Sequence, residues 1–127
     1  MDLIARLYLE NFSLSKGNIF QLIKGTVYSY FKSNKQKQNI NNTIKTKLAS
    51  FGVRGTKFFI QSKTKDYLCV CKGEVEVVNN FGAKQTLKAN EDIYITKSIN
   101  KLKKLKASQM MIDLGEKIFR DMGHPVN

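Results

Sequence analysis

Short β-forming segments follow one another at regular spacing through most of this chain, and this pattern constrains its fold more than any other feature. In the clearest segment, Val75 and Val77 alternate with Glu74 and Glu76, as expected of a half-buried strand. Gly, Asn and Lys residues punctuate the segments. The expected strands cover residues 19–23, 26–31, 44–50, 56–61, 67–71, 74–78, 83–88 and 92–96. The sequence therefore predicts an all-β domain over residues 18–97, built as a short-stranded sandwich, a roll or a solenoid-like stack.

The segments on either side of this domain have different patterns. The spacing of Leu3, Ile4, Leu7 and Tyr8 is compatible with a short amphipathic helix over residues 2–11, within an N-terminal part of the chain that ends at residue 17. Residues 33–43 are polar and lack periodicity, which predicts a loop. No stretch has the length and hydrophobicity of a transmembrane segment, and the N-terminus does not resemble a signal peptide. The chain is therefore expected to be either cytosolic or a piece of a longer envelope protein.

Residues 98–127 predict a basic linker followed by an amphipathic helix over 107–122. Gly123 and Pro125 suit the end of this helix. The helix carries more apolar surface than an isolated tail should, so it either packs on the β domain as a lid or docks on a partner. The candidate partner-binding residues are Met110, Met111, Leu114, Ile118 and Phe119.

A Gly-Val-Arg-Gly sequence precedes one of the strongest strand signals. Because Gly adopts positive φ readily, Gly52 and Gly55 predict a tight corner that leads into the strand. The chain has 22 basic residues, of which only three are Arg, and the planar fork of Arg54 suits a fixed, partly buried partner. We expect Arg54 to be held by backbone carbonyls or by Glu91 or Asp92, in preference to binding a ligand.

Residues 46–58, Thr-Lys-Leu-Ala-Ser-Phe-Gly-Val-Arg-Gly-Thr-Lys-Phe, resemble the T-P-x-A-x-x-x-V-R-G-T-x-F signature of FecR-type domains. Residues 73–77 are similar to the G-x-V-x-V of that family, and residues 87–91 to its L-x-A-G-E turn. Lys47 and Asn90 stand where the family has Pro and Gly, and Asn tolerates the left-handed conformation that such a turn needs. The resemblance covers about residues 25–95. The structural motif that it implies consists of Gly52, Val53, Arg54, Gly55, Thr56, Phe58, Gly73 and Glu91.

The resemblance implies a non-enzymatic, protein-binding module of a bacterial regulatory or cell-envelope protein. The 42% apolar content over 127 residues suits a folded domain and excludes a disordered chain. The net charge of +12 supports one alternative, a basic nucleic-acid-binding protein with a small β-barrel-like domain. The cations are nearly all Lys and are scattered along the chain, whereas base and phosphate recognition favours Arg, so the protein partner is preferred.

The sequence offers no convincing catalytic or metal-binding set, and no cofactor is expected. His124 is the single histidine, and it lies far along the chain from Cys69 and Cys71. The two cysteines are two residues apart on an expected strand, so both side chains face the same side and are expected to be small core hydrophobes. Residues 73–95 also look like the second half of a cupin barrel, but without the histidine ligands of metal-dependent cupins.

Overall fold

The computed structural model describes residues 3–16, 19–31, 42–97 and 101–126, and these ranges contain eight strands and one helix. The strands and the helix are β1 (Leu3–Lys16), β2 (Ile19–Phe31), β3 (Asn42–Lys45), β4 (Ala49–Ser62), β5 (Asp66–Asn79), β6 (Lys84–Lys88), β7 (Glu91–Ile95), β8 (Leu105–Lys106) and α1 (Gln109–Asp121). The all-β fold with a C-terminal helix is therefore confirmed.

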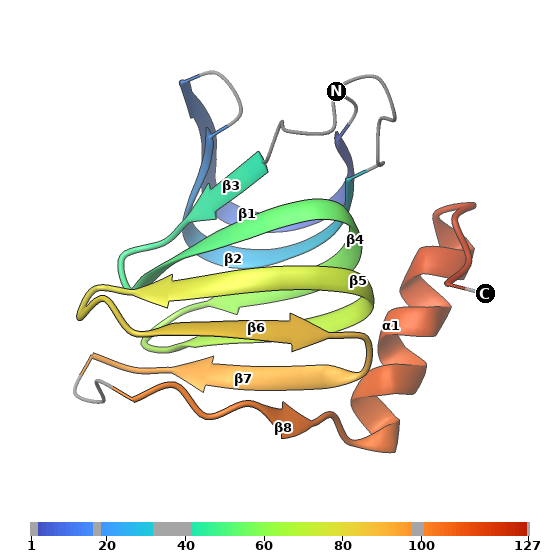
Figure 1. Cartoon of the computed structure of the whole chain (residues 1–127). Helices are drawn as coiled ribbons and strands as arrows, with labels where there is room; N and C mark the ends of the chain where they lie inside the picture. The colour runs from blue at the N-terminus through green and yellow to red at the C-terminus, as the bar shows by residue number, and fades with distance from the viewer. Residues whose placement is uncertain (1–2, 17–18, 32–41, 98–100, 127) are drawn as a thin grey trace.

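The strands form one sheet that rolls up into a nearly barrel-shaped wrap (Figure 1). Its order is β1-β2-β3-β4-β5-β7-β8, with β6 also on β5 and an additional pairing between β2 and β4. All pairs are antiparallel except β2 with β3. The two halves of β5 have different neighbours, because β7 pairs with its first half and β6 with its second half. β5 therefore contributes its two halves to different sides of the rolled sheet, and β4 does the same through its pairing with β3 and β2.

The long strands bend where the sequence predicted them to end. β5 runs without interruption through Gly73, whose φ of 88° lies in the left-handed region. β4 runs through Gly52, which has no positive φ, and its register with β5 shifts between Arg54 and Lys57. The predicted tight corner at Gly52 and the predicted strand break at residues 72–73 are therefore wrong. A β-bulge lets a strand bend while its ladder continues, and a local sequence pattern does not distinguish this from a turn.

Two apolar clusters lie on opposite faces of the sheet. On β4, Phe58 and Ile60 point into the rolled sheet, and Phe59 points outward. On β5, Leu68 and Val70 point inward while the alternate residues Tyr67, Cys69 and Cys71 point outward. The inner cluster is the main core, and the outer cluster is completed by Ile118 and Phe119 of α1. The helix therefore covers an outward face of the sheet that is as apolar as a core.

The predicted N-terminal helix is wrong, because β1 covers Leu3–Lys16 and pairs with β2 along its length. Leu3 and Ile4 lie three and four residues before Leu7 and Tyr8, a spacing that fits a short helix. This local preference is weak, and the hydrogen bonds between β1 and β2 override it. The predicted loop over 33–43 lies outside the described residues except for its last two positions, which belong to β3.

The C-terminal helix is confirmed within about two residues at each end. Ser108 caps it by accepting a hydrogen bond from the Met111 amide (3.3 Å), and Gly123, with φ of 81°, ends it. The segment before the helix is not only a linker, because β8 pairs with the start of β7. Ala107 is also fixed, since its amide donates to the Asn90 carbonyl (2.8 Å).

Candidate functional site

The residues of the sequence motif surround the bend that β4 and β5 share. Val53 and Phe58 are buried in the inner cluster. Thr56 is fully buried, and its Oγ1 donates to the Glu74 carbonyl (2.8 Å), which ties the bulge of β4 to β5 one residue beyond Gly73. Thr56 thus links the two strands at their bend, and the structural role expected of the whole motif stays a prediction.

Arg54 and Gly55 belong to β4, but their surroundings lie outside what the structure describes. The Cα atom of Arg54 pairs across the strands with Glu74. The partner of the Arg54 guanidinium therefore stays a prediction.

The two carboxylates predicted as partners of Arg54 have other contacts. Glu91 accepts from the Lys88 amide (2.7 Å) and lies 3.4 Å from Lys104 Nζ. The Lys88 hydrogen bond is the main cause that lowers the pKa of Glu91. Asp92 accepts from the hydroxyl of Tyr67 (2.7 Å). Asn90 lies in the turn before them with φ of 67°, so the left-handed conformation expected at this position is confirmed.

The underside of α1 lies on the two cysteines. Both are buried and free, and both face the helix, so their expected common orientation is confirmed. A hydrogen bond from Cys71 lowers the pKa of the Cys69 thiol, while the same bond and burial raise the pKa of Cys71. Gly115 of the helix lies so close to Cys71 that a Cβ atom at this position would force the thiol or the helix to shift. α1 therefore approaches the sheet closely at this point.

The five candidate partner-binding residues of α1 divide between its two sides. Ile118 and Phe119 are buried in the outer cluster, and Met111 is partly buried against it. Met110 and Leu114 are exposed to 74% and 36%, respectively. As they are four residues apart, they are neighbours on one side of the helix. In this packed arrangement, only Met110 and Leu114 are well placed to meet a partner.

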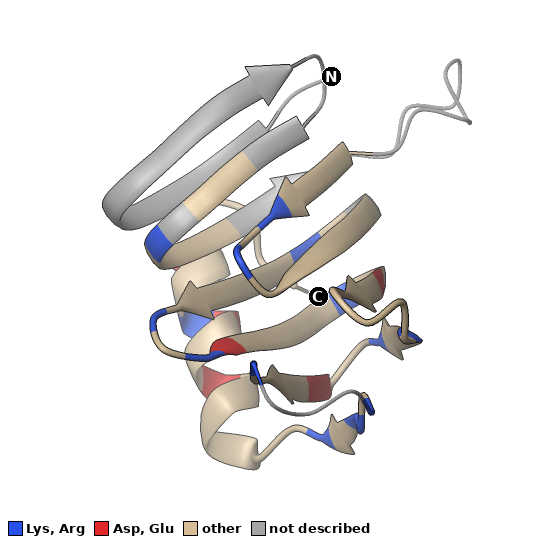
Figure 2. Ribbon diagram, turned by 90° about the vertical axis from the view of Figure 1, so that its left-hand side faces the viewer, with Lys and Arg blue, Asp and Glu red and all other residues tan. Residues whose placement is uncertain are grey.

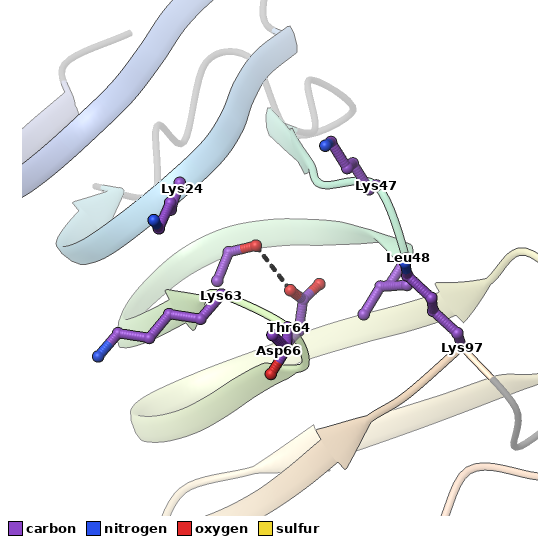
Figure 3. A pocket seen from close by; sticks show the side chains of 8 residues that line it. Lys24, Lys47, Leu48, Lys63, Thr64, Asp66 and Lys97 are labelled. Atoms are coloured by element: carbon purple, nitrogen blue, oxygen red, sulfur yellow. Dashed lines mark hydrogen bonds between the residues drawn. The ribbon is translucent and has the colours of Figure 1, made fainter.

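Loops at one end of the rolled sheet form a cavity that the sequence did not reveal (Figure 3). Figure 2 colours Lys and Arg blue along the ribbon, and several of these residues lie in the loops that join the strands. It has a volume of about 400 Å³, and Asp66 lies on its floor. A second pocket of about 260 Å³ adjoins it and shares Lys47, Leu48 and Lys97. We call the two together the lysine groove. The lining residues are Lys24, Lys47, Leu48, Ser62, Lys63, Thr64 and Asp66, with Asn79, Asn80, Phe81, Thr96 and Lys97.

Three of the four lysines of the groove come from separate loops, and the fourth, Lys24, lies within β2. Lys47 follows β3, Lys63 lies between β4 and β5, and Lys97 follows β7. Each is exposed. Their distances along the chain hid the groove in the sequence, because each lysine read alone is an ordinary surface cation. The pairing of β5 with β7 places Lys97 beside the turn between β4 and β5, which carries Lys63. Lys47 precedes the other end of β4, and the bend of that strand brings it close, as the hydrogen bond from Thr46 to Asp66 shows.

Asp66 is a buried carboxylate with a defined set of partners. It accepts hydrogen bonds from the Ser62 hydroxyl (2.7 Å) and the Thr46 hydroxyl. Burial nevertheless raises its pKa above the usual range. The Thr46 hydroxyl also accepts from the Leu48 and Ala49 amides (3.2 Å each), so Asp66 stabilises the turn between β3 and β4.

No group of three or more His, Cys, Asp or Glu residues that could hold a metal ion occurs in the described ranges. Glu74 and Glu76 are exposed on β5. Within the same ranges, no helix has the length and apolar character needed to cross a membrane.

Comparison with known proteins places the chain in a family. The family model described as FecR protein matches residues 4–76, more than half of the chain. No curated protein matches it. Two crystal structures, each of a putative anti-sigma factor from Parabacteroides distasonis ATCC 8503, share the fold. The first has a TM-score of 0.61 and 17% sequence identity over 76% of this chain. The second has a TM-score of 0.64 and 14% sequence identity over 89% of this chain. This chain covers 46% and 63% of them, less than two thirds of either. The chain belongs to the FecR family.

Proposed function

We propose that this chain is a non-enzymatic module that binds a protein partner in a sigma-factor regulatory system of the bacterial cell envelope. The FecR match over residues 4–76 carries the proposal, because it spans the bent strands that build the fold. The shared fold with two structures that bear the anti-sigma designation supports it. Because fold alone does not determine function, the proposal also depends on the surfaces of this chain.

The buried polar groups support a binding module in preference to an enzyme. Catalytic acids and bases usually converge on a cleft that a substrate can enter. Here Tyr67 donates to Asp92, and Lys57 donates to the Pro125 carbonyl (2.6 Å). Each of these contacts joins two segments of the fold, and Lys57 holds the chain that follows α1 against β4.

The exposed side of α1 is the first candidate partner surface. Met110 and Leu114 lie on a helix that is fixed at both ends, at Ala107 and at Pro125. A rigid helix presents its apolar side chains to a partner at little entropic cost, and Met adapts its shape to the contact. A helix placed in a partner groove commonly contributes residues at this four-residue spacing.

The experiment compares partner capture by two double variants of a tagged chain produced in its native cells. The double variant Met110→Lys, Leu114→Lys should fail to capture a partner that the unmodified chain captures, which is expected to be a sigma factor, a sigma regulator or an outer-membrane transporter. Tyr94→Lys with Leu105→Lys is the matched control, since both residues are exposed apolar side chains that lie on β7 and β8 instead of α1. Deletion of the gene should also change transcription that depends on that sigma factor. Capture of none of these partners, together with unchanged transcription, would contradict the proposal.

The net charge of +12 favours one second candidate, non-specific binding of nucleic acid. A titration of random duplex DNA at several salt concentrations separates the two. Affinity that persists at physiological salt and falls steeply as salt rises would favour nucleic acid.

A further inference from the structure

The lysine groove lies at the end of the rolled sheet, apart from the exposed side of α1. We propose that this groove binds an acidic, extended segment of a partner protein. The inference deepens the proposed function and rests on it, because it gives the chemistry of the partner at a second surface. The charge, the apolar contacts and the continuity of the groove each support it.

The charge of the groove is strongly positive. Lys24, Lys47, Lys63 and Lys97 line the first pocket. Among the residues that the structure describes, Asp66 is the only carboxylate that lines either pocket. It is fully buried and already accepts two hydrogen bonds, so it is directed inward and not toward an occupant. A carboxylate of a partner would therefore meet ammonium groups at the rim, and none of the described lining residues would present an exposed negative charge to it.

The groove also has apolar contacts along its length. Leu48 is buried at the wall that the two pockets share. Phe81 lines the second pocket and is 60% exposed. The turn that carries Phe81 is well ordered by hydrogen bonds, because Asn79 Oδ1 accepts from the amides of Phe81 (3.0 Å) and Ala83 (2.9 Å). An exposed aromatic ring on an ordered turn, beside cations, suits a segment in which acidic and apolar residues are interspersed.

The shape favours an extended segment over a compact anion. The two pockets adjoin at Lys47 and Lys97, so an occupant can run from the cationic pocket past Phe81. An inorganic phosphate would fill only part of this length. The described lining residues include Lys but no Arg, so they do not offer the bidentate fork that suits phosphate groups.

Two other macromolecular occupants fit less well. Single-stranded nucleic acid is usually held by several aromatic rings that stack on successive bases, whereas Phe81 is the only aromatic residue among the described residues that line the groove. A second copy of this chain would bring another net charge of +12 toward the lysines, which opposes self-association at this end.

The test uses the full chain and a short fluorescent peptide rich in Glu and Asp with one Phe, followed by anisotropy. Lys47→Gln with Lys97→Gln removes the two lysines that both pockets share and should weaken binding about tenfold. Lys72→Gln with Lys117→Gln is the matched control, because it removes the same charge from exposed positions outside the groove and should change the affinity by less than about twofold. All four side chains are exposed, and a thermal melt of each variant checks that the fold is retained.

Three outcomes decide the inference. Phe81→Ser should weaken binding of the Phe-containing peptide and leave a peptide without Phe unaffected, which would place the apolar contact in the groove. Equal weakening by both lysine pairs would show a general charge effect and overturn the inference. Displacement of the peptide by single-stranded DNA or inorganic phosphate at equal charge would also overturn it, in favour of a general anion site. Loss of the groove alone leaves partner capture through Met110 and Leu114 intact, so a failure here is distinct from a failure of the proposed function.

Discussion

Gly115 of α1 lies directly over Cys71 of β5, and a Cβ atom built on Gly115 would come within 2.5 Å of the Cys71 Sγ atom. The same Cβ would lie 3.4 Å from Cε1 of Phe59. Helix and sheet are therefore in contact through backbone on one side and side chains on the other. Glycine in a helix costs stability, roughly 1 kcal/mol relative to alanine, so close packing must offset this cost here.

We expect Gly115→Ala to destabilise the fold in spite of its better helix propensity. Overpacking costs about 1–3 kcal/mol, which exceeds or balances the helical gain of about 1 kcal/mol. In a Cys71→Ala background the nearest obstacle is absent, so the same substitution should become neutral or stabilising. Urea unfolding of the four proteins of this double-mutant cycle measures the difference. Identical effects of Gly115→Ala in both backgrounds would show that Cys71 does not set the height of the helix.

The hydrogen bond from Tyr67, a member of the outer cluster, to Asp92 joins β5 to β7. Tyr67→Phe keeps the ring and removes the donor, so the free energy of unfolding should fall by about 1–2 kcal/mol. Tyr94→Phe is the control, since Tyr94 is an exposed neighbour whose ring lies 4.7 Å from that of Tyr67. Thermal unfolding of both variants is the measurement, and equal losses would contradict the assignment.

Asp66 predicts a pH dependence of stability. Its folded pKa is raised above the ordinary value of 3.8 because burial disfavours the charged form. The unfolded chain therefore releases this proton at lower pH than the folded chain does. The contribution of Asp66 to stability is full below pH 3.8 and is lost as pH rises through the folded pKa.

Asp66→Asn removes this titration while keeping the size of the side chain. The stability of the unmodified protein minus that of Asp66→Asn should be largest near pH 3 and decrease toward pH 7. Urea unfolding at several pH values measures this difference. A difference that grows with pH would mean that the hydrogen bonds from Thr46 and Ser62 outweigh burial.

The sequence predicted the elements whose apolar spacing is local and missed those that depend on distant pairing. The stripe that includes Met111 and Ile118 was sufficient to predict α1, and its Ser108 cap and Gly123 end follow ordinary helix rules. The sequence predicts a turn at Gly73, but a glycine with positive φ suits a turn and a β-bulge equally well. Only the pairing with β4, which continues on both sides of Gly73, shows that the strand bends here without ending. The N-terminal strand was missed for the same reason, since its stability comes from β2.

The candidate surfaces differ in the same way. The exposed position of Met110 follows from helical periodicity once the buried stripe is known. The lysine groove required the closure of the sheet, since Lys24 and Lys97 are far apart in the sequence and line one pocket. A charge scattered along the chain can therefore be gathered in space, and composition alone does not reveal this.

Arg54 gives a prediction that rests on its chemistry and its family motif. Arg54→Ala should lower the free energy of unfolding by about 2–4 kcal/mol, because a partly buried partner would lose its counter-charge. Arg54→Lys should restore little of this loss, since Lys lacks the planar fork. Thermal melts of both variants test the role, and double-mutant cycles with Glu91 and Asp92 test the two expected partners. Unchanged melts in both single variants would remove Arg54 from the structural motif.

The last prediction concerns whether α1 is a fixed lid or opens to engage a partner. The helix buries Ile118 and Phe119, and Lys57 of β4 donates to the Pro125 carbonyl beyond its end. These contacts favour a fixed lid, so hydrogen exchange should protect the amides of residues 111–119 as strongly as those of residues 58–60 in β4. Lys57→Met removes the donor, and it should speed exchange in the last turn of α1 without changing exchange in β4. Lys84→Gln, a control at an exposed position on β6, should change neither. Faster exchange over the whole helix in the unmodified protein would show instead that α1 opens locally, which would expose Met111 and Phe119 to a partner.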